Sequence, residues 1–156
     1  MKTLILYATK YGAAREIAER ISDRMGGVVL HDLKQSSMPD LAGFDCVIIG
    51  SSLYAGSIRK EAKAFLAQHI SSLRQKTIGL FLSGMAAGDE AKYFADNFPG
   101  DILQSAKASR FLGGIFDPKK AGRMERMVIK IVTKKSEYTN TIDEEKIRTF
   151  AETMVS

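Results

Sequence analysis

Residues 2–15 read KTLILYATKYGAAR, and they determine how the rest of the chain is interpreted. Residues 2–8 form an apolar run typical of a buried strand, and residues 9–15 continue from it into a helical pattern. α/β proteins hold phosphate groups at such a turn, because free backbone N–H groups and the positive end of the helix dipole both face the anion. The stretch therefore predicts a phosphorylated cofactor.

The composition is that of one soluble domain. The chain has 156 residues, of which 45% are hydrophobic and 26% charged. It has no apolar run long enough to span a membrane, and its N-terminus lacks the pattern of a signal peptide. The single cysteine, Cys46, lies in an apolar run, which predicts a buried thiol and a reducing compartment. We therefore expect a cytoplasmic protein.

The net charge of +5 is concentrated in one segment. Residues 107–135 contain nine basic and two acidic residues, a net charge of +7, so the remainder of the chain carries −2. The basic character therefore belongs to this segment and needs its own explanation.

Strand and helix patterns alternate along the chain. Four apolar runs follow the first strand, and the segments between them or after the last have helical spacing. We expect strands at 28–30, 46–50, 77–82 and 109–116 and helices at 14–25, 58–73, 89–98 and 143–154, the last with Thr141 or Asp143 near its cap. Five strands joined by helices predict an α/β fold with a parallel sheet and right-handed crossovers.

Three turns rich in glycine and serine follow the first, third and fourth strands, at 9–14, 51–57 and 83–88. Ligands of such sheets bind beyond the carboxyl ends of the strands, where the strand order reverses. The first turn has only Gly12, which argues against a dinucleotide-binding motif, and a P-loop is absent. What remains is a turn that offers hydroxyl groups and backbone amides to one terminal phosphate.

This turn resembles the first turn of the flavodoxin family, whose pattern is Thr or Ser, any residue, Thr, Gly, any residue, Thr. Thr9 takes the first hydroxyl position and Gly12 the glycine, whereas Tyr11 and Ala14 stand where the pattern has threonines. The positive charge of Lys10 or Arg15 offers partial compensation for the hydroxyl missing at Ala14.

The resemblance implies a doubly wound five-stranded sheet of order 2-1-3-4-5 over residues 1–156, with FMN bound non-covalently at the three turns. Tyr54 is expected to stack on the isoalloxazine ring, the alternative being a surface tyrosine in a loop. The third turn is expected to supply backbone donors and an apolar wall. The implied cofactor-binding residues are Thr9, Lys10, Tyr11, Gly12, Ala13, Ala14, Ser51, Ser52, Leu53, Tyr54, Ala55, Gly56, Ser83, Gly84, Met85 and Ala86.

An extra basic amphipathic helix is predicted near residues 120–135. Its apolar positions between 121 and 132 fall on one arc, and an adjacent stripe is formed by Lys119, Arg123, Arg126, Lys130 and Lys134. This pattern fits a helix packed by its apolar arc with a solvated basic side, or one docked on an anionic membrane surface or an acidic partner. No nucleic acid is expected, because the stripe has no interleaved aromatic residues.

The basic segment also bears on the subfamily. Residues 126–132, the first strand and the turn at residues 50–54 are similar to the flavodoxin-type, menaquinone-dependent protoporphyrinogen dehydrogenases. That family carries a long basic insertion after the fourth strand, whereas residues 84–107 are short and acidic here.

Three functions remain open at this point. One is an electron carrier with a redox partner protein, and another is an FMN-dependent enzyme oxidising a porphyrinogen with a quinone, peripheral at the inner face of the membrane. The third is a flavin-free phosphate-binding or regulatory domain, because Ala14 weakens the motif.

Other site chemistry is not indicated. His31 and His69 have no neighbours at metal-ligand spacing, so no metal site is expected. Ser51 and Ser83 follow strands but lie outside the G-x-S-x-G pattern of hydrolases, and no catalytic side chain is assigned.

Overall fold

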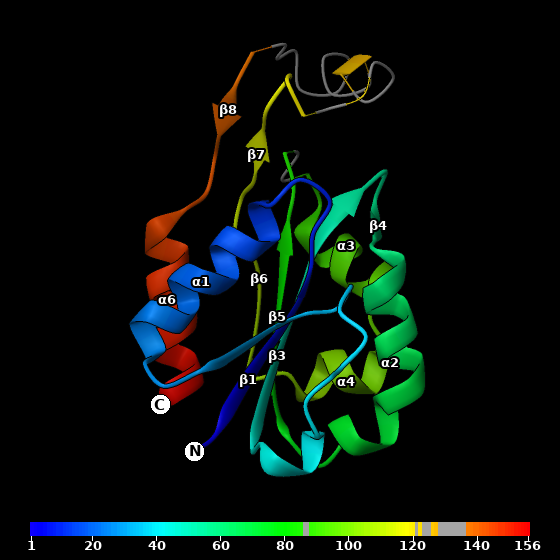
Figure 1. Cartoon of the computed structure of the whole chain (residues 1–156), viewed down its shortest axis with the longest axis vertical. Coiled ribbons are helices and arrows are strands. Elements are labelled where there is room, and N and C mark those ends of the chain that lie inside the picture. Colours follow the sequence, from blue (N-terminus) through cyan, green and yellow to red (C-terminus); the bar gives the residue numbers. More distant parts are fainter. Residues whose placement is uncertain (86–87, 121, 123–125, 128–136) are drawn as a thin grey trace.

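Five parallel strands form the centre of the computed structural model, which describes residues 1–85, 88–120, 122, 126–127 and 137–156 (Figure 1). Their spatial order is β2-β1-β3-β5-β6, which is the predicted 2-1-3-4-5 order of the five long strands. The strands are β1 (Thr3–Ala8), β2 (Val29–Asp32), β3 (Cys46–Tyr54), β5 (Thr77–Ser83) and β6 (Ala108–Phe111).

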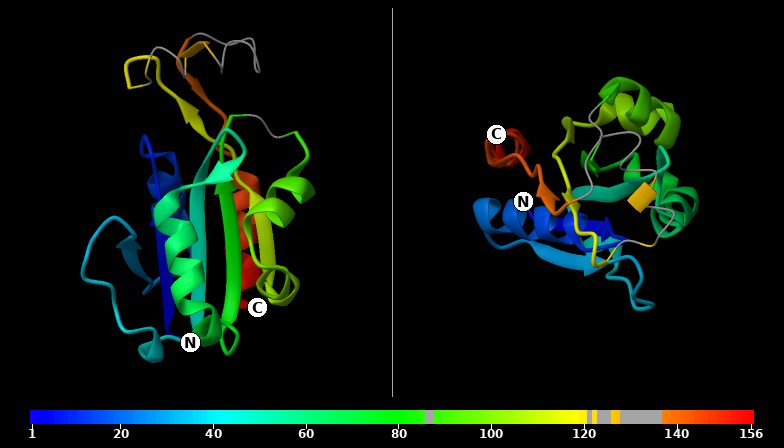
Figure 2. Two further views of the ribbon diagram at one scale, coloured as in Figure 1. Left: turned by 90° about the vertical axis from the view of Figure 1, so that its right-hand side faces the viewer. Right: turned by 90° about the horizontal axis from the view of Figure 1, so that it is seen from above.

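Helices cover both faces of this sheet (Figures 1 and 2). α1 (Ala13–Met25) and α6 (Glu144–Val155) pack on one face, where Phe81 of β5 meets Phe150 edge to face. The other face is covered by α2 (Lys60–Leu73), α3 (Glu90–Asn97) and α4 (Gly100–Ser105). Burial on both faces explains why the central strands are continuously apolar. Cys46 is fully buried as predicted, and burial raises the pKa of its thiol.

The expected last strand, 109–116, was wrong as a single element. The chain leaves the sheet after β6, and β7 (Ile115–Phe116) pairs antiparallel with β8 (Thr139–Asn140) to form a two-stranded ribbon beyond the carboxyl ends of the sheet (Figure 1). Gly113 makes the change of direction with a φ of 87°, and Gly114 lies against the backbone of Gly84.

Three smaller elements also differ from the expectation. The helix expected at 89–98 is α3, but the separate helix α4, which begins after Pro99, was not predicted. Residues 57–58 form β4 (Ser57–Ile58), which pairs with β3 and delays the start of α2. A 3-10 turn, η1 (Leu41–Gly43), lies in the irregular segment before β3.

The predicted basic helix lies almost entirely outside the described residues. Of its stripe, Lys119 and Arg126 are described and both are exposed, whereas Arg123, Lys130 and Lys134 are not described. In the described part of the chain, no helix has the length and apolar character needed to cross a membrane.

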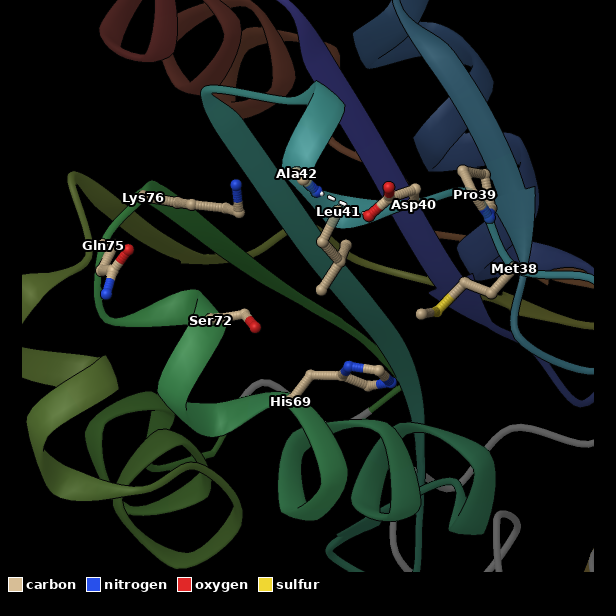
Figure 3. Close-up of a pocket in the computed structure, with 9 residues that line it drawn as sticks. All are labelled: Met38, Pro39, Asp40, Leu41, Ala42, His69, Ser72, Gln75 and Lys76. Carbon is tan, nitrogen blue, oxygen red and sulfur yellow. Dashed lines mark hydrogen bonds between the residues drawn. The ribbon is translucent and has the colours of Figure 1, made fainter.

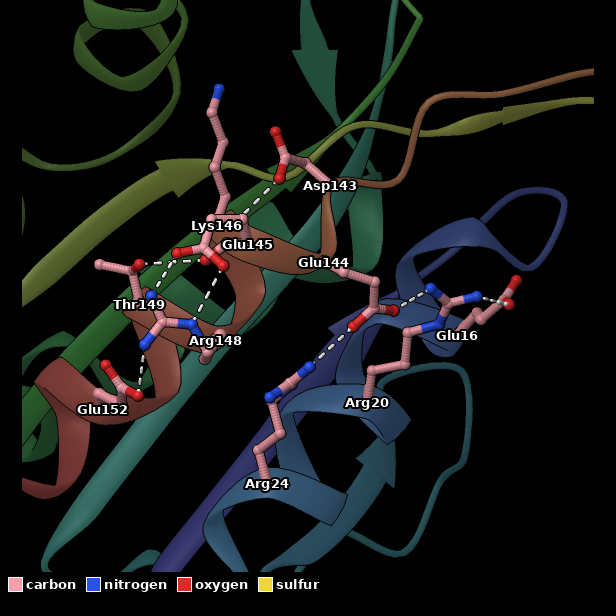
Figure 4. Close-up of polar contacts among 10 residues, drawn as sticks. All are labelled: Glu16, Arg20, Arg24, Asp143, Glu144, Glu145, Lys146, Arg148, Thr149 and Glu152. Carbon is pink, nitrogen blue, oxygen red and sulfur yellow. Dashed lines mark hydrogen bonds and ion pairs between the residues drawn. The ribbon is translucent and has the colours of Figure 1, made fainter.

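Glu144, at the start of α6, links α6 to α1 through Arg20 and Arg24 (Figure 4). Its Oε2 lies 3.2 Å from Nη2 of Arg24, and Arg20 also pairs with Glu16 at 2.6 Å. The hydrogen bond from Arg24, with further help from Arg20, lowers the pKa of Glu144 below its ordinary value of 4.5.

We expect Glu144→Gln to lower the free energy of unfolding at pH 7 by about 0.5 kcal/mol, because the pairs are half exposed and screened by solvent. A lowered pKa in the folded state stabilises the fold above the unfolded pKa, and this contribution is lost as the pH falls through the folded value. The difference between wild type and Glu144→Gln should therefore shrink as the pH falls below 4.5 and vanish once Glu144 is protonated in the folded state as well. Urea titrations at several pH values check this, with Glu19→Gln, which breaks a pair within α1, as the control.

Candidate cofactor site at the carboxyl ends of the strands

The segments that follow β1, β3 and β5 lie together at the carboxyl end of the sheet (Figure 1). The first two are joined directly, since the N–H of Lys10 donates to Oγ of Ser52 at 3.2 Å. This is the place where the strand order reverses between β1 and β3, as the sequence predicted.

The loop after β1 is organised by Thr9 and Gly12. The N–H of Gly12 donates to Oγ1 of Thr9 at 2.9 Å, and Gly12 adopts a left-handed φ of 102° as it opens α1. The starts of α1, α2 and α4 have no side-chain cap, whereas Asp89 and Asp143 cap α3 and α6. An uncapped N-terminus following β1 offers backbone amides to an anion.

Two of the residues predicted for this loop can reach a ligand through their backbone only. The side chains of Ala13 and Ala14 are buried, and Ala14 is fully enclosed in the core beneath α1. The hydroxyl that the family pattern has at position 14 is therefore replaced by a core methyl group. Tyr7, just below the loop, is also buried, and burial together with Asp32 raises the pKa of its phenol.

The second predicted turn, 51–57, is shorter than expected. Residues 51–54 continue β3, and the turn itself is formed by Ala55 and Gly56, both with positive φ, before β4 begins. Paired positive φ values suit the twist of a tight hairpin, which explains why the strand extends past its glycine and serines.

Ser51 supports this hairpin from below. It is fully buried, and its Oγ accepts the N–H of Arg59 at 2.9 Å and donates to the carbonyl of Ser52 at 3.0 Å. Both bonds use the hydroxyl of Ser51, so this residue positions the β3–β4 hairpin. Ser52, Leu53 and Tyr54 follow it along β3.

Sequence reasoning missed Asn97, which fixes the hairpin from α3. Its Oδ1 accepts the N–H of Ile58 at 3.0 Å, and its Nδ2 donates to the carbonyl of Gly56 at 2.9 Å. No sequence pattern signals this role, because it depends on the distant packing of α3 against β4.

The third segment begins at Ser83, the last residue of β5. Ser83 is 1% exposed, and its Oγ has no hydrogen-bond partner among the described residues. The N–H of Gly84 donates to the carbonyl of Gly113 at 3.1 Å, so the third segment is hydrogen-bonded to the chain that leaves β6. Met85 is half-buried, and Ala86 lies outside the described residues.

Two partly exposed aromatic rings lie near Lys10. Tyr11 and Tyr54 have exposed fractions of 37% and 44%, and the ammonium of Lys10 lies 5.4 Å and 3.8 Å from their ring centroids. The structure thus brings the first two predicted segments into contact through Lys10 and Ser52.

A pocket of about 430 Å³ lies at the opposite end of the sheet, between η1 and the end of α2 (Figure 3). Three of its polar side chains already have partners within the protein. Asp40 caps η1, Lys76 donates to the carbonyl of Phe44, and His69 stacks on Phe65. Its position and its occupied polar groups make it a poorer candidate than the carboxyl end of the sheet.

Comparisons with known proteins agree with this fold. The family model described as a flavodoxin domain matches residues 4–143. A flavodoxin from Trichodesmium erythraeum (strain IMS101) is 30% identical over 98 residues, which are 60% of this chain and 56% of the relative. The chain thus matches little more than half the length of that relative.

Two solved structures share the fold. Oxidised flavodoxin 2 from Bacillus cereus has a TM-score of 0.62 at 21% identity, covering 99% of this chain and 98% of that one. A flavoprotein in complex with FMN from Lactobacillus acidophilus NCFM has a TM-score of 0.50 at 18% identity, covering 72% of this chain and 91% of that one.

Proposed function

The chain belongs to the flavodoxin domain family, and from this premise we propose that it binds FMN non-covalently and carries electrons between redox partners. The observation that supports this best is the uncapped start of α1 at left-handed Gly12, at the point where the order of the strands reverses. A helix start of this kind suits a terminal phosphate.

The residues at the site fit FMN in three respects. Thr9 and the amides that open α1 offer a phosphate site, and Ser83 has a buried hydroxyl without a partner in the described part of the chain. Tyr54 offers an exposed ring to one side of a flat ligand.

In this proposal each loop has its own task. Thr9, Gly12 and the following amides hold the phosphate, while Tyr54 and Met85 flank the ring. The bound FMN supplies the redox chemistry, and the protein contributes binding, orientation and local charge.

An electron-transfer assay tests the carrier function. The FMN-loaded protein is mixed with an NADPH-dependent flavoprotein reductase and cytochrome c. We expect cytochrome reduction to rise with the concentration of this protein. A rate equal to that without the protein, from a sample shown to hold FMN, would contradict the carrier function.

A second candidate function is a quinone-linked dehydrogenase of the protoporphyrinogen type, acting at an anionic membrane surface. The basic segment favours it, because β7 and β8, which flank residues 117–138, lie beyond the carboxyl end of the sheet (Figure 2). Lys119, Lys120, Arg126 and Met127 are exposed there. A cationic and apolar surface of this kind suits anionic lipid headgroups.

We expect the wild type to sediment with vesicles rich in anionic lipid, and Lys119→Glu/Lys120→Glu to weaken this binding about tenfold or more, since each basic residue contributes about 1 kcal/mol near such a surface. Lys60→Glu/Lys63→Glu on α2 is the matched control and should bind like wild type. Oxidation of protoporphyrinogen with a menaquinone analogue, measured on the same samples, tests the enzyme. Turnover no faster than in buffer removes this second candidate.

A further inference from the structure

Lys10 reaches from the loop after β1 to the carboxyl end of β3 by two separate contacts. Its backbone N–H donates to Oγ of Ser52, and its ammonium lies 3.8 Å from the centroid of the Tyr54 ring. One residue thus connects the loop expected to hold the phosphate with the ring expected to flank the flavin.

We propose that Lys10 is a positioning residue of the cofactor site that holds Tyr54 in place and sets a positive charge beside the bound ring, so that the site favours reduced, anionic FMN. This inference rests on the proposed binding of FMN. A cation over the face of a tyrosine is attracted by the ring quadrupole, which restricts both side chains.

The charges around the site support this role. Residues 9–12 and 51–59 contain two basic residues, Lys10 and Arg59, and no acidic ones.

The redox chemistry makes this charge measurable. Two electrons and one proton convert oxidised FMN, whose ring is neutral, into the reduced form with one negative charge on the ring. A nearby ammonium stabilises that negative charge by Coulomb attraction, whereas it has little effect on the neutral oxidised ring. Lys10 should therefore strengthen the binding of reduced FMN relative to oxidised FMN.

The contact itself is tested without any cofactor. In NMR spectra of the apoprotein, we expect the ε-methylene protons of Lys10 to be shifted upfield by the Tyr54 ring and to move back in Tyr54→Leu. Random-coil shifts in wild type would overturn the proposal. This readout is independent of whether FMN binds.

The charge is tested by the midpoint potential of bound FMN, titrated anaerobically with dithionite against a reference dye. We expect Lys10→Met to reduce the ratio of reduced to oxidised affinity about tenfold, which lowers the two-electron potential by about 30 mV. Lys10→Arg should keep the wild-type value, since it keeps the charge and the ring contact. Lys2→Met, which removes the same charge at the other end of β1, is the matched control and should also match wild type.

The outcomes separate this inference from the proposed function. If wild type fails to bind FMN, the proposed function itself is wrong, and this inference falls with it. If wild type binds FMN and Lys10→Met has the same potential as Lys2→Met, only the role of Lys10 is overturned. A loss of oxidised FMN binding in Lys10→Met also overturns it, because Lys10 would then hold the phosphate and not the ring end.

Discussion

Gly113→Ala should lower the free energy of unfolding by about 3 kcal/mol or more, the sum of backbone strain and overpacking. Gly113 has a φ of 87°, where an alanine is strained, and its Cβ would lie 2.0 Å from the carbonyl oxygen of Thr141. The carbonyl of Thr141 belongs to the backbone and cannot swing away as the end of a side chain could. The overlap can therefore be removed only if the chain leaving β6 moves away from Thr141. Urea unfolding followed by circular dichroism measures the loss.

Gly26→Ala is the matched control for this prediction. Gly26 also has a positive φ, 75°, but a Cβ there has no neighbour within 4 Å among the described residues. We expect a loss of about 1 kcal/mol from strain alone. Equal losses in the two variants would show that the close packing at Gly113 contributes nothing.

Gly12→Val should weaken FMN binding about a hundredfold or more and leave riboflavin binding nearly unchanged. A β-branched residue strongly disfavours the φ of 102° at Gly12, so the loop must rearrange and the amides that open α1 no longer meet on one phosphate. Each charge-assisted hydrogen bond contributes about 1.5–3 kcal/mol, so the loss of two accounts for the effect. Riboflavin lacks the phosphate and reports on the ring site alone.

The effect at Gly12 comes from backbone conformation, because a Cβ there meets nothing within 4 Å in the described structure. Gly27→Val provides the control, with a φ of 64°, equally open surroundings and a place beyond the other end of α1. It should retain the FMN affinity of wild type. Equal affinity of Gly12→Val and wild type for FMN would place the phosphate elsewhere.

The fold was predictable from the sequence because its signals are local. Apolar runs around Leu4, Ile48 and Leu80 mark strands buried on both faces, and the helical spacing between them implies crossovers. The strand order came from the resemblance to the flavodoxin family, and its reversal between β1 and β3 predicts where a ligand would bind. The strand and helix signals themselves need only neighbouring residues and general rules of chain topology.

The features that sequence reasoning missed depend on contacts between distant segments. Asn97 fixes the β3–β4 hairpin from another helix, and Gly114 packs on the backbone of Gly84. The break between β6 and β7 depends on the contact of Gly113 with Thr141. The residues on either side of this break are apolar, so the sequence pattern reads as one continuous strand. The contact of Lys10 with Tyr54 likewise joins residues 44 positions apart.

The binding of FMN is measured most directly by titrating FMN into the apoprotein and following the quenching of flavin fluorescence, with riboflavin titrated in parallel. We predict saturable one-to-one quenching by FMN and about a hundredfold weaker binding of riboflavin, because riboflavin lacks the phosphate that the loop of Thr9 and Gly12 would hold. FMN fluorescence that stays unquenched at every protein concentration would contradict the flavin site and favour a flavin-free phosphate-binding or regulatory domain.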